Sequence, residues 1–121
     1  MIEIVLQSCK AFDLLVKMRT LEELKNILAE NREELKEKFK LKRLGIFGSY
    51  ARNEQREDSD LDLLVAFEDE KSIRGFEFIG RMMDLEEFLE NILGIKVHLA
   101  TERQAMNSNK WEYVKKDLIC V

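Results

Sequence analysis

The sequence predicts a small α/β protein in which a short mixed sheet packs against helices. Three observations predict this fold class. Two long segments repeat apolar residues at helical spacing, short apolar runs between them are typical of strands, and the two kinds of segment alternate along the chain. The 121 residues, of which 45% are hydrophobic, are enough for one core and therefore for one domain.

The first element with a clear start signal begins at Thr20. Residues 1–19 are an N-terminal extension of uncertain structure, for which the sequence indicates only a short helix after Ser8. Thr20 and Glu23 have the spacing of a capping box, in which the hydroxyl accepts from the Glu23 amide and the carboxylate reaches back. A helix is therefore predicted from Thr20 to about Phe39, with a buried stripe of Leu21, Leu24, Leu28 and Leu35.

Two predicted strands flank a Gly-Ser turn in the middle of the chain. Residues 42–47 form the first strand and lead into Gly48-Ser49, and Ala51 is predicted to begin a short helix whose N-terminus points toward the same place. Successive residues of a strand face opposite sides of the sheet. In the second strand, Leu61, Leu63 and Val65 should face one side, and Asp60, Asp62 and Leu64 the other.

The last third of the chain predicts a helix, a strand and a final short helix. The long helix runs from Gly75 to Leu93, and Gly94 is expected to end it in the left-handed conformation. Its predicted core residues are Phe76, Ile79, Met83, Phe88 and Ile92. Residues 96–100 form the third strand, and residues 109–118 form a helix that carries Trp111 and Val114.

The residues that indicate chemistry are the Gly48-Ser49 pair and the carboxylates Asp60 and Asp62. A glycine lets backbone N–H groups approach a phosphate closely, and the serine hydroxyl adds a further donor. Two carboxylates two residues apart on a strand point to the same face, where both can hold one hard cation. The sequence therefore predicts a site for a nucleoside triphosphate and a divalent metal.

Plainer interpretations of the same residues stay open. Asp60 and Asp62 could be solvated carboxylates at the start of a strand, although aspartate is disfavoured among strand residues. Arg52 could neutralise phosphate charge, or it could form a surface salt bridge to Glu54 or Glu57. Tyr50 is predicted to pack against the first helix.

Composition excludes several classes of function. The net charge of −4 argues against a dedicated nucleic-acid-binding protein, which would carry a basic face. No apolar run approaches the roughly 20 residues that span a bilayer, and the first residues do not resemble a signal peptide. A cytoplasmic protein is therefore expected. In such a protein Cys9 and Cys120, which have no metal-ligand spacing, are interpreted as free thiols.

The run Gly48-Ser49-Tyr50-Ala51-Arg52, followed by Ser59-Asp60-Leu61-Asp62, resembles the nucleotidyltransferases of the DNA polymerase beta superfamily. It is most similar to the minimal nucleotidyltransferase branch, and the resemblance covers residues 20–121. It implies a nucleotidyltransferase fold, with Asp60 and Asp62 as ligands of Mg²⁺ or Mn²⁺. It also implies nucleotide binding by Gly48, Ser49 and Arg52.

The same resemblance implies a partner. Small members of this branch commonly pair with a helical HEPN toxin, act as its antitoxin and transfer AMP from ATP onto it. A homo- or hetero-oligomer would be in keeping with such a role. Transfer to a small molecule is disfavoured, because 121 residues leave no room for an additional domain that would build the acceptor site.

One position departs from the family pattern. Fully active members carry a third catalytic carboxylate on the third strand, where this chain has His98 between Val97 and Leu99. Histidine is a poor ligand for Mg²⁺ but an adequate one for Mn²⁺, and it can accept a proton near neutral pH. Two interpretations follow: an active transferase that uses His98 at its catalytic site, or an impaired binding module that neutralises its partner by forming a complex.

Overall fold

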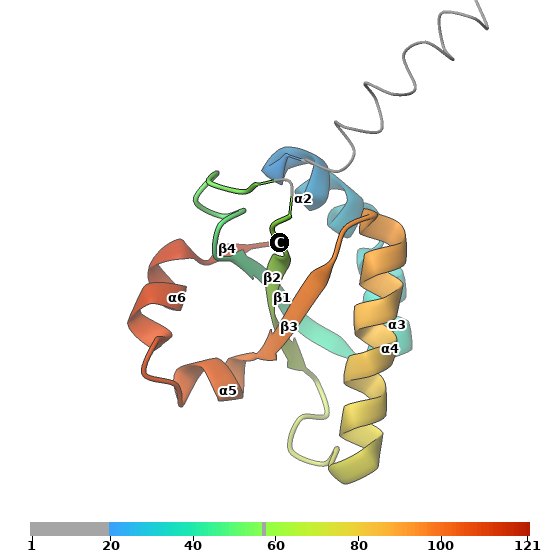
Figure 1. Ribbon diagram of the computed structural model, residues 1–121. Helices are drawn as coiled ribbons and strands as arrows, with labels where there is room; N and C mark the ends of the chain where they lie inside the picture. Colours follow the sequence, from blue (N-terminus) through green and yellow to red (C-terminus); the bar gives the residue numbers. More distant parts are fainter. Residues whose placement is uncertain (1–19, 57) are drawn as a thin grey trace, which may run out of the picture.

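The computed structural model describes residues 20–56 and 58–121, which form four strands and five helices (Figure 1). In chain order the elements are α2 (Leu21–Glu30), α3 (Arg32–Phe39), β1 (Leu41–Phe47), β2 (Leu61–Phe67), α4 (Gly75–Leu93), β3 (Val97–Thr101), α5 (Glu102–Met106), α6 (Trp111–Asp117) and β4 (Ile119–Cys120). The predicted α/β fold class is confirmed. The short helix predicted after Ser8 lies outside the described residues.

The four strands form one mixed sheet in the order β3-β2-β1-β4. Strand β1 is antiparallel to β2 and to β4, whereas β2 and β3 are parallel and are joined through α4. The register places Phe47 of β1 and His98 of β3 on either side of Asp62. The sheet therefore brings the Gly-Ser turn, the carboxylate strand and His98 together at one end.

The core lies between the sheet and the helices α2, α3 and α4. Leu61, Leu63 and Val65 face this core and are fully buried, as the alternation predicted. They pack with Leu24, Leu28 and Leu35 of the first two helices and with Leu85, Leu89 and Leu93 of α4. Leu64 points to the opposite face, where α5 contacts β2, and it is buried as well.

The predicted core face of α4 is wrong in its first half. Phe76, Ile79 and Met83 are 93%, 53% and 64% exposed, whereas Phe88 and Ile92 are partly buried. The buried stripe is instead Leu85, Leu89 and Leu93. Phe76 lies nine residues before Leu85. At roughly 100° per residue, this spacing places the two side chains on opposite sides of the helix. The helix has apolar residues on two opposite sides, and periodicity alone cannot decide which side faces the sheet.

The structure also differs from the predicted elements elsewhere in the chain. The first long helix is divided at Asn31, whose side-chain amide donates to the Ile27 carbonyl at 2.8 Å. No helix begins at Ala51, because the chain makes successive turns there and Asn53 has a φ of 58°. Helix α5 and strand β4 were not predicted, although Thr101 and Gln104 form a capping box that marks the start of α5.

Two predicted helix ends are confirmed. Thr20 caps α2 by accepting a hydrogen bond from the Glu23 amide at 3.2 Å, and Gly94 ends α4 with a φ of 71°. Within residues 20–56 and 58–121, no helix has both the length and the apolar character that crossing a membrane requires.

Candidate nucleotidyltransferase site

The Gly-Ser turn follows β1 directly and is held by its own backbone. The Gly48 carbonyl accepts from the Arg52 amide at 3.2 Å, and the Ser49 carbonyl accepts from the Glu54 amide at 2.8 Å. Gly48 has a φ of 78°, in the left-handed region that glycine adopts without strain. The turn thus reverses the chain at the end of the sheet and presents Ser49, which is half-buried, beside the start of β2.

Gly48 lies directly against Asp62. A Cβ atom on Gly48 would lie 2.3 Å from Oδ2 of Asp62 and 3.2 Å from its Cγ, so no larger residue fits there without displacing the carboxylate. The turn backbone and the carboxylate are therefore in contact. Asp60 lies just before β2 and is exposed.

The environment of Asp62 disfavours its negative charge. Burial raises the pKa of Asp62, and the nearby charge of Asp60 raises it further, while His98 and Arg52 lower it. The same Asp60 charge adds to burial in raising the pKa of Tyr50. A cation bound at the carboxylate pair would offset both the burial of Asp62 and its repulsion by Asp60.

His98 lies beside Asp62, as the strand register requires. Its Nδ1 atom is 3.5 Å from Oδ1 of Asp62, and its side chain is 67% exposed. This distance is longer than a good hydrogen bond, so the contact is chiefly electrostatic and depends on the imidazole being protonated. Most of the imidazole is open to solvent, where a substrate can reach it.

Within the described residues, the ion-pair partners of Arg52 are Glu54 and Asp117 rather than Asp60 or Asp62. The Nε atom of Arg52 donates to Glu54 at 3.1 Å and its Nη1 donates to Asp117 at 2.6 Å. The predicted salt bridge to Glu54 is therefore present. Asp117 could not be predicted as a partner, because it lies 65 residues further along the chain at the end of α6.

Tyr50 is part of the core, as predicted. It is 1% exposed and belongs to the same apolar cluster as Leu24 and Leu28 of α2. It therefore anchors the turn to the helical layer.

The donor set at this end of the sheet fits a hard divalent cation that is shared with phosphate. Asp60 and Asp62 supply oxygen ligands, which Mg²⁺ prefers, and Mg²⁺ is commonly held by one or two carboxylates together with substrate phosphates. No group of three or more His, Cys, Asp or Glu side chains within the described ranges is arranged to hold a metal by itself. The carboxylate pair thus suits a metal that arrives with a nucleotide.

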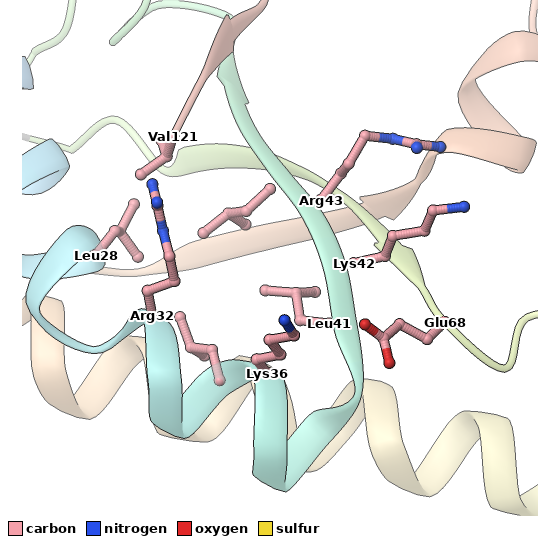
Figure 2. Close-up of a pocket in the computed structure, with 10 residues that line it drawn as sticks. Leu28, Arg32, Lys36, Leu41, Lys42, Arg43, Glu68 and Val121 are labelled. Carbon is pink, nitrogen blue, oxygen red and sulfur yellow. The ribbon is translucent and has the colours of Figure 1, made fainter.

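A hollow elsewhere on the surface is separate from these residues. It encloses about 300 Å³ between α3 and the first half of β1 (Figure 2). Its floor is formed by leucines, and Arg32, Lys36 and Lys42 stand at its rim. None of the motif residues lines it.

Comparison with known proteins agrees with the motif. Residues 28–120 match the family model described as nucleotidyltransferase domain. A candidate protein adenylyltransferase of Methanocaldococcus jannaschii is 43% identical over 104 residues, covering 86% of this chain and all of the relative. The protein adenylyltransferase MntA of Thermococcus cleftensis is 46% identical over 82 residues, covering 68% of this chain and 77% of the relative.

Solved structures share the fold. A structure of a candidate minimal nucleotidyltransferase has a TM-score of 0.63 at 36% identity, covering 84% of this chain and 95% of that one. A crystal structure of a toxin–antitoxin with AMP-PNP has a TM-score of 0.53 at 20% identity, covering 75% of this chain and 69% of that one. At this identity, the match shows a likeness of fold alone. Together with the Gly-Ser turn against Asp62, these matches show that the chain belongs to the nucleotidyltransferase domain family, among its minimal nucleotidyltransferases.

Proposed function

We propose that this nucleotidyltransferase transfers AMP from ATP to a hydroxyl group of a partner protein, and that the partner is a HEPN-type toxin for which the chain is the cytoplasmic antitoxin. The observation that carries the proposal is the contact between Gly48 and Asp62. It places backbone donors suited to phosphate directly beside a carboxylate suited to the accompanying cation. The relatives named as protein adenylyltransferases support the choice of AMP and of a protein acceptor.

Each site residue has a distinct role in this proposal. The Gly48-Ser49 backbone and the Ser49 hydroxyl bind the phosphates, and Asp60 and Asp62 hold Mg²⁺ or Mn²⁺. The metal, when bound, neutralises negative charge on the phosphates. Arg52 can add positive charge if it leaves Glu54 and Asp117 for the nucleotide.

The reaction itself needs one proton acceptor and an incoming hydroxyl. The acceptor oxygen bonds to the α-phosphorus as the bond between that phosphorus and the bridging oxygen breaks, so pyrophosphate leaves. His98 is exposed beside Asp62 and can take the hydroxyl proton. In this proposal the acceptor hydroxyl arrives on another molecule, since Asp60 and His98 are both exposed to solvent.

A second candidate function rests on His98. The family resemblance places a third carboxylate at this position, and an imidazole removes one negative charge from the metal site. Its Nδ1 atom instead lies 3.5 Å from Asp62, where a protonated ring would compete with a cation for that carboxylate. A binding module that neutralises its partner by forming a complex is the alternative that this contact favours.

Calorimetry with ATP and Mg²⁺ or Mn²⁺ tests the nucleotide site. The Asp60→Asn/Asp62→Asn double variant is expected to bind the metal nucleotide at least ~10-fold more weakly, because both anionic ligands are lost. Asp58→Asn is the matched control, since Asp58 is an exposed carboxylate in the loop before β2. Equal binding by the wild type and the double variant would refute the assignment of this site.

A further inference from the structure

Two buried side-chain polar atoms have no hydrogen-bond partner among the described residues, and both lie in the segment between Gly48 and Asp60. They are the hydroxyl of Tyr50 and Oε1 of Gln55. Buried polar groups are nearly always hydrogen-bonded, because an unpaired one loses its contacts with water and gains none in return. Gln55 is partly exposed, so its amide can turn toward water, whereas Tyr50 is only 1% exposed. The Tyr50 hydroxyl is therefore the group that needs a physical explanation.

The position of the Tyr50 side chain is fixed by its surroundings. Its ring packs in the core with Leu24 and Leu28 of α2. Its backbone carbonyl accepts from the Asn53 amide at 3.2 Å, within the same set of turns that follows Gly48. The hydroxyl oxygen is thus held inside the protein, in the turn that approaches the carboxylates.

Asp60 has the complementary deficiency. With the other described residues, its exposed carboxylate accepts no hydrogen bond and forms no ion pair. The backbone on both sides of it is fixed, since the Ser59 amide donates to the Arg56 carbonyl at 3.0 Å. On the other side, the Leu61 amide donates to the Lys96 carbonyl at 2.8 Å. Adjustment to a bound cation therefore falls on the side chain of Asp60.

The Tyr50 hydroxyl and the Asp60 carboxylate are near enough to interact. The negative charge of Asp60 adds to burial in raising the pKa of Tyr50, and such an effect declines with distance. A phenolic hydroxyl can donate, and an ionised carboxylate only accepts. Hydrogen bonds to an ionised acceptor are roughly twice as strong as those between neutral groups. Asp60 therefore suits the unpaired hydroxyl better than the neutral amide oxygen of Gln55 does.

We propose that Tyr50 is a positioning residue, whose hydroxyl donates to the Asp60 carboxylate when the metal nucleotide is bound. The inference rests on the nucleotide site proposed above. In the free protein the hydroxyl stays unpaired and lowers the stability of the fold. With the metal nucleotide bound, it holds the carboxylate in the orientation that binds the cation. Carboxylate ligands of metals are themselves commonly hydrogen-bonded, and removal of such a partner weakens metal binding about 10- to 100-fold.

Replacing Tyr50 with phenylalanine separates the two states, because the variant loses the hydroxyl and keeps the ring. The melting temperature of the free variant should rise by about 4 °C, since an unpaired buried hydroxyl is removed. In calorimetry the same variant should bind ATP with Mg²⁺ at least ~10-fold more weakly. Binding of ATP in the presence of a chelator should be unchanged, because Asp60 acts through the metal. Tyr113→Phe is the matched control, since Tyr113 is 73% exposed on α6.

Double-mutant cycles test whether Tyr50 acts through Asp60. In the Asp60→Ala background, Tyr50→Phe should change the binding of ATP with Mg²⁺ by less than ~2-fold, because the acceptor is already gone. In the Gln55→Ala background, Tyr50→Phe should still weaken binding ~10-fold. High protein concentrations keep the weakened binding measurable, and thermal unfolding checks that each variant is folded.

Three results would overturn the proposal. The first is a Tyr50→Phe variant less stable than the wild type, which would show that the hydroxyl is already paired in the free protein. The second is unchanged binding of ATP with Mg²⁺ by that variant. The third is an equal loss in the Asp60→Ala background, or a loss that disappears only with Gln55→Ala, since either would assign the hydroxyl to another acceptor. These results leave the proposed function standing, whereas equal binding by the wild type and the Asp60→Asn/Asp62→Asn variant would overturn both.

Discussion

Replacing Gly48 with alanine is expected to reduce AMP transfer by at least ~100-fold, about 2.7 kcal/mol of transition-state stabilisation. Two physical effects add in this variant. The new Cβ would lie 2.3 Å from Oδ2 of Asp62, which forces the carboxylate or the turn to move. The backbone also has a φ of 78°, which an L-residue adopts only with strain. Label transfer from ATP to the partner protein measures the loss.

Gly75→Ala is the control that separates these two effects. Gly75 also has a positive φ, of 61°, but a Cβ there meets nothing within 4 Å. This variant carries the backbone strain without the clash, so it should lose about 1 kcal/mol of stability and keep its transfer rate. If Gly48→Ala transfers AMP as fast as Gly75→Ala does, contact between the turn and Asp62 is not required for catalysis.

Replacing His98 with aspartate is expected to raise Mg²⁺-dependent transfer at least ~10-fold, about 1.4 kcal/mol of transition-state stabilisation. His98 is paired with Asp62 in the sheet register, so an aspartate there adds a third carboxylate next to the existing pair. The additional charge should strengthen Mg²⁺ binding, since Mg²⁺ prefers oxygen to nitrogen ligands. In the wild type, which retains the imidazole, Mn²⁺ should support faster transfer than Mg²⁺ does.

His98→Asn is the matched control for this experiment, because it has nearly the shape of aspartate without the charge. It should not reproduce the gain in Mg²⁺. A wild type that is inert in both metals, beside an active His98→Asp, would identify the natural protein as a binding module. A wild type that already matches His98→Asp in Mg²⁺ would show that the third carboxylate does not belong at this strand position.

Much of the site could be predicted from the sequence because its parts are local. Gly48 and Ser49 directly follow β1, and Asp60 and Asp62 lie at the start of β2, so strand alternation and turn chemistry predict that they meet. His98 was placed through the family pattern, and the parallel pairing of β2 with β3 confirms that it lies beside Asp62. The metal and nucleotide roles of these residues remain predictions.

The features that sequence reasoning missed depend on tertiary contacts. Arg52 is held by Asp117, a partner that no local pattern indicates. Helix α4 has apolar residues on two sides, and only packing against the sheet shows that Leu85, Leu89 and Leu93 form the core side. Strand β4 has two residues, too few for any periodicity, and it forms only because β1 offers an edge.

The most direct test of the central claim is label transfer from α-labelled ATP to the co-purified HEPN-type partner, in Mg²⁺ and in Mn²⁺. We predict that the partner gains AMP on a hydroxyl, that chelation of the metal stops the reaction, and that the Asp60→Asn/Asp62→Asn variant binds the partner without labelling it. A partner that co-purifies but stays unlabelled in both metals would contradict the account and leave a binding module. Failure to co-purify at all would refute the antitoxin assignment.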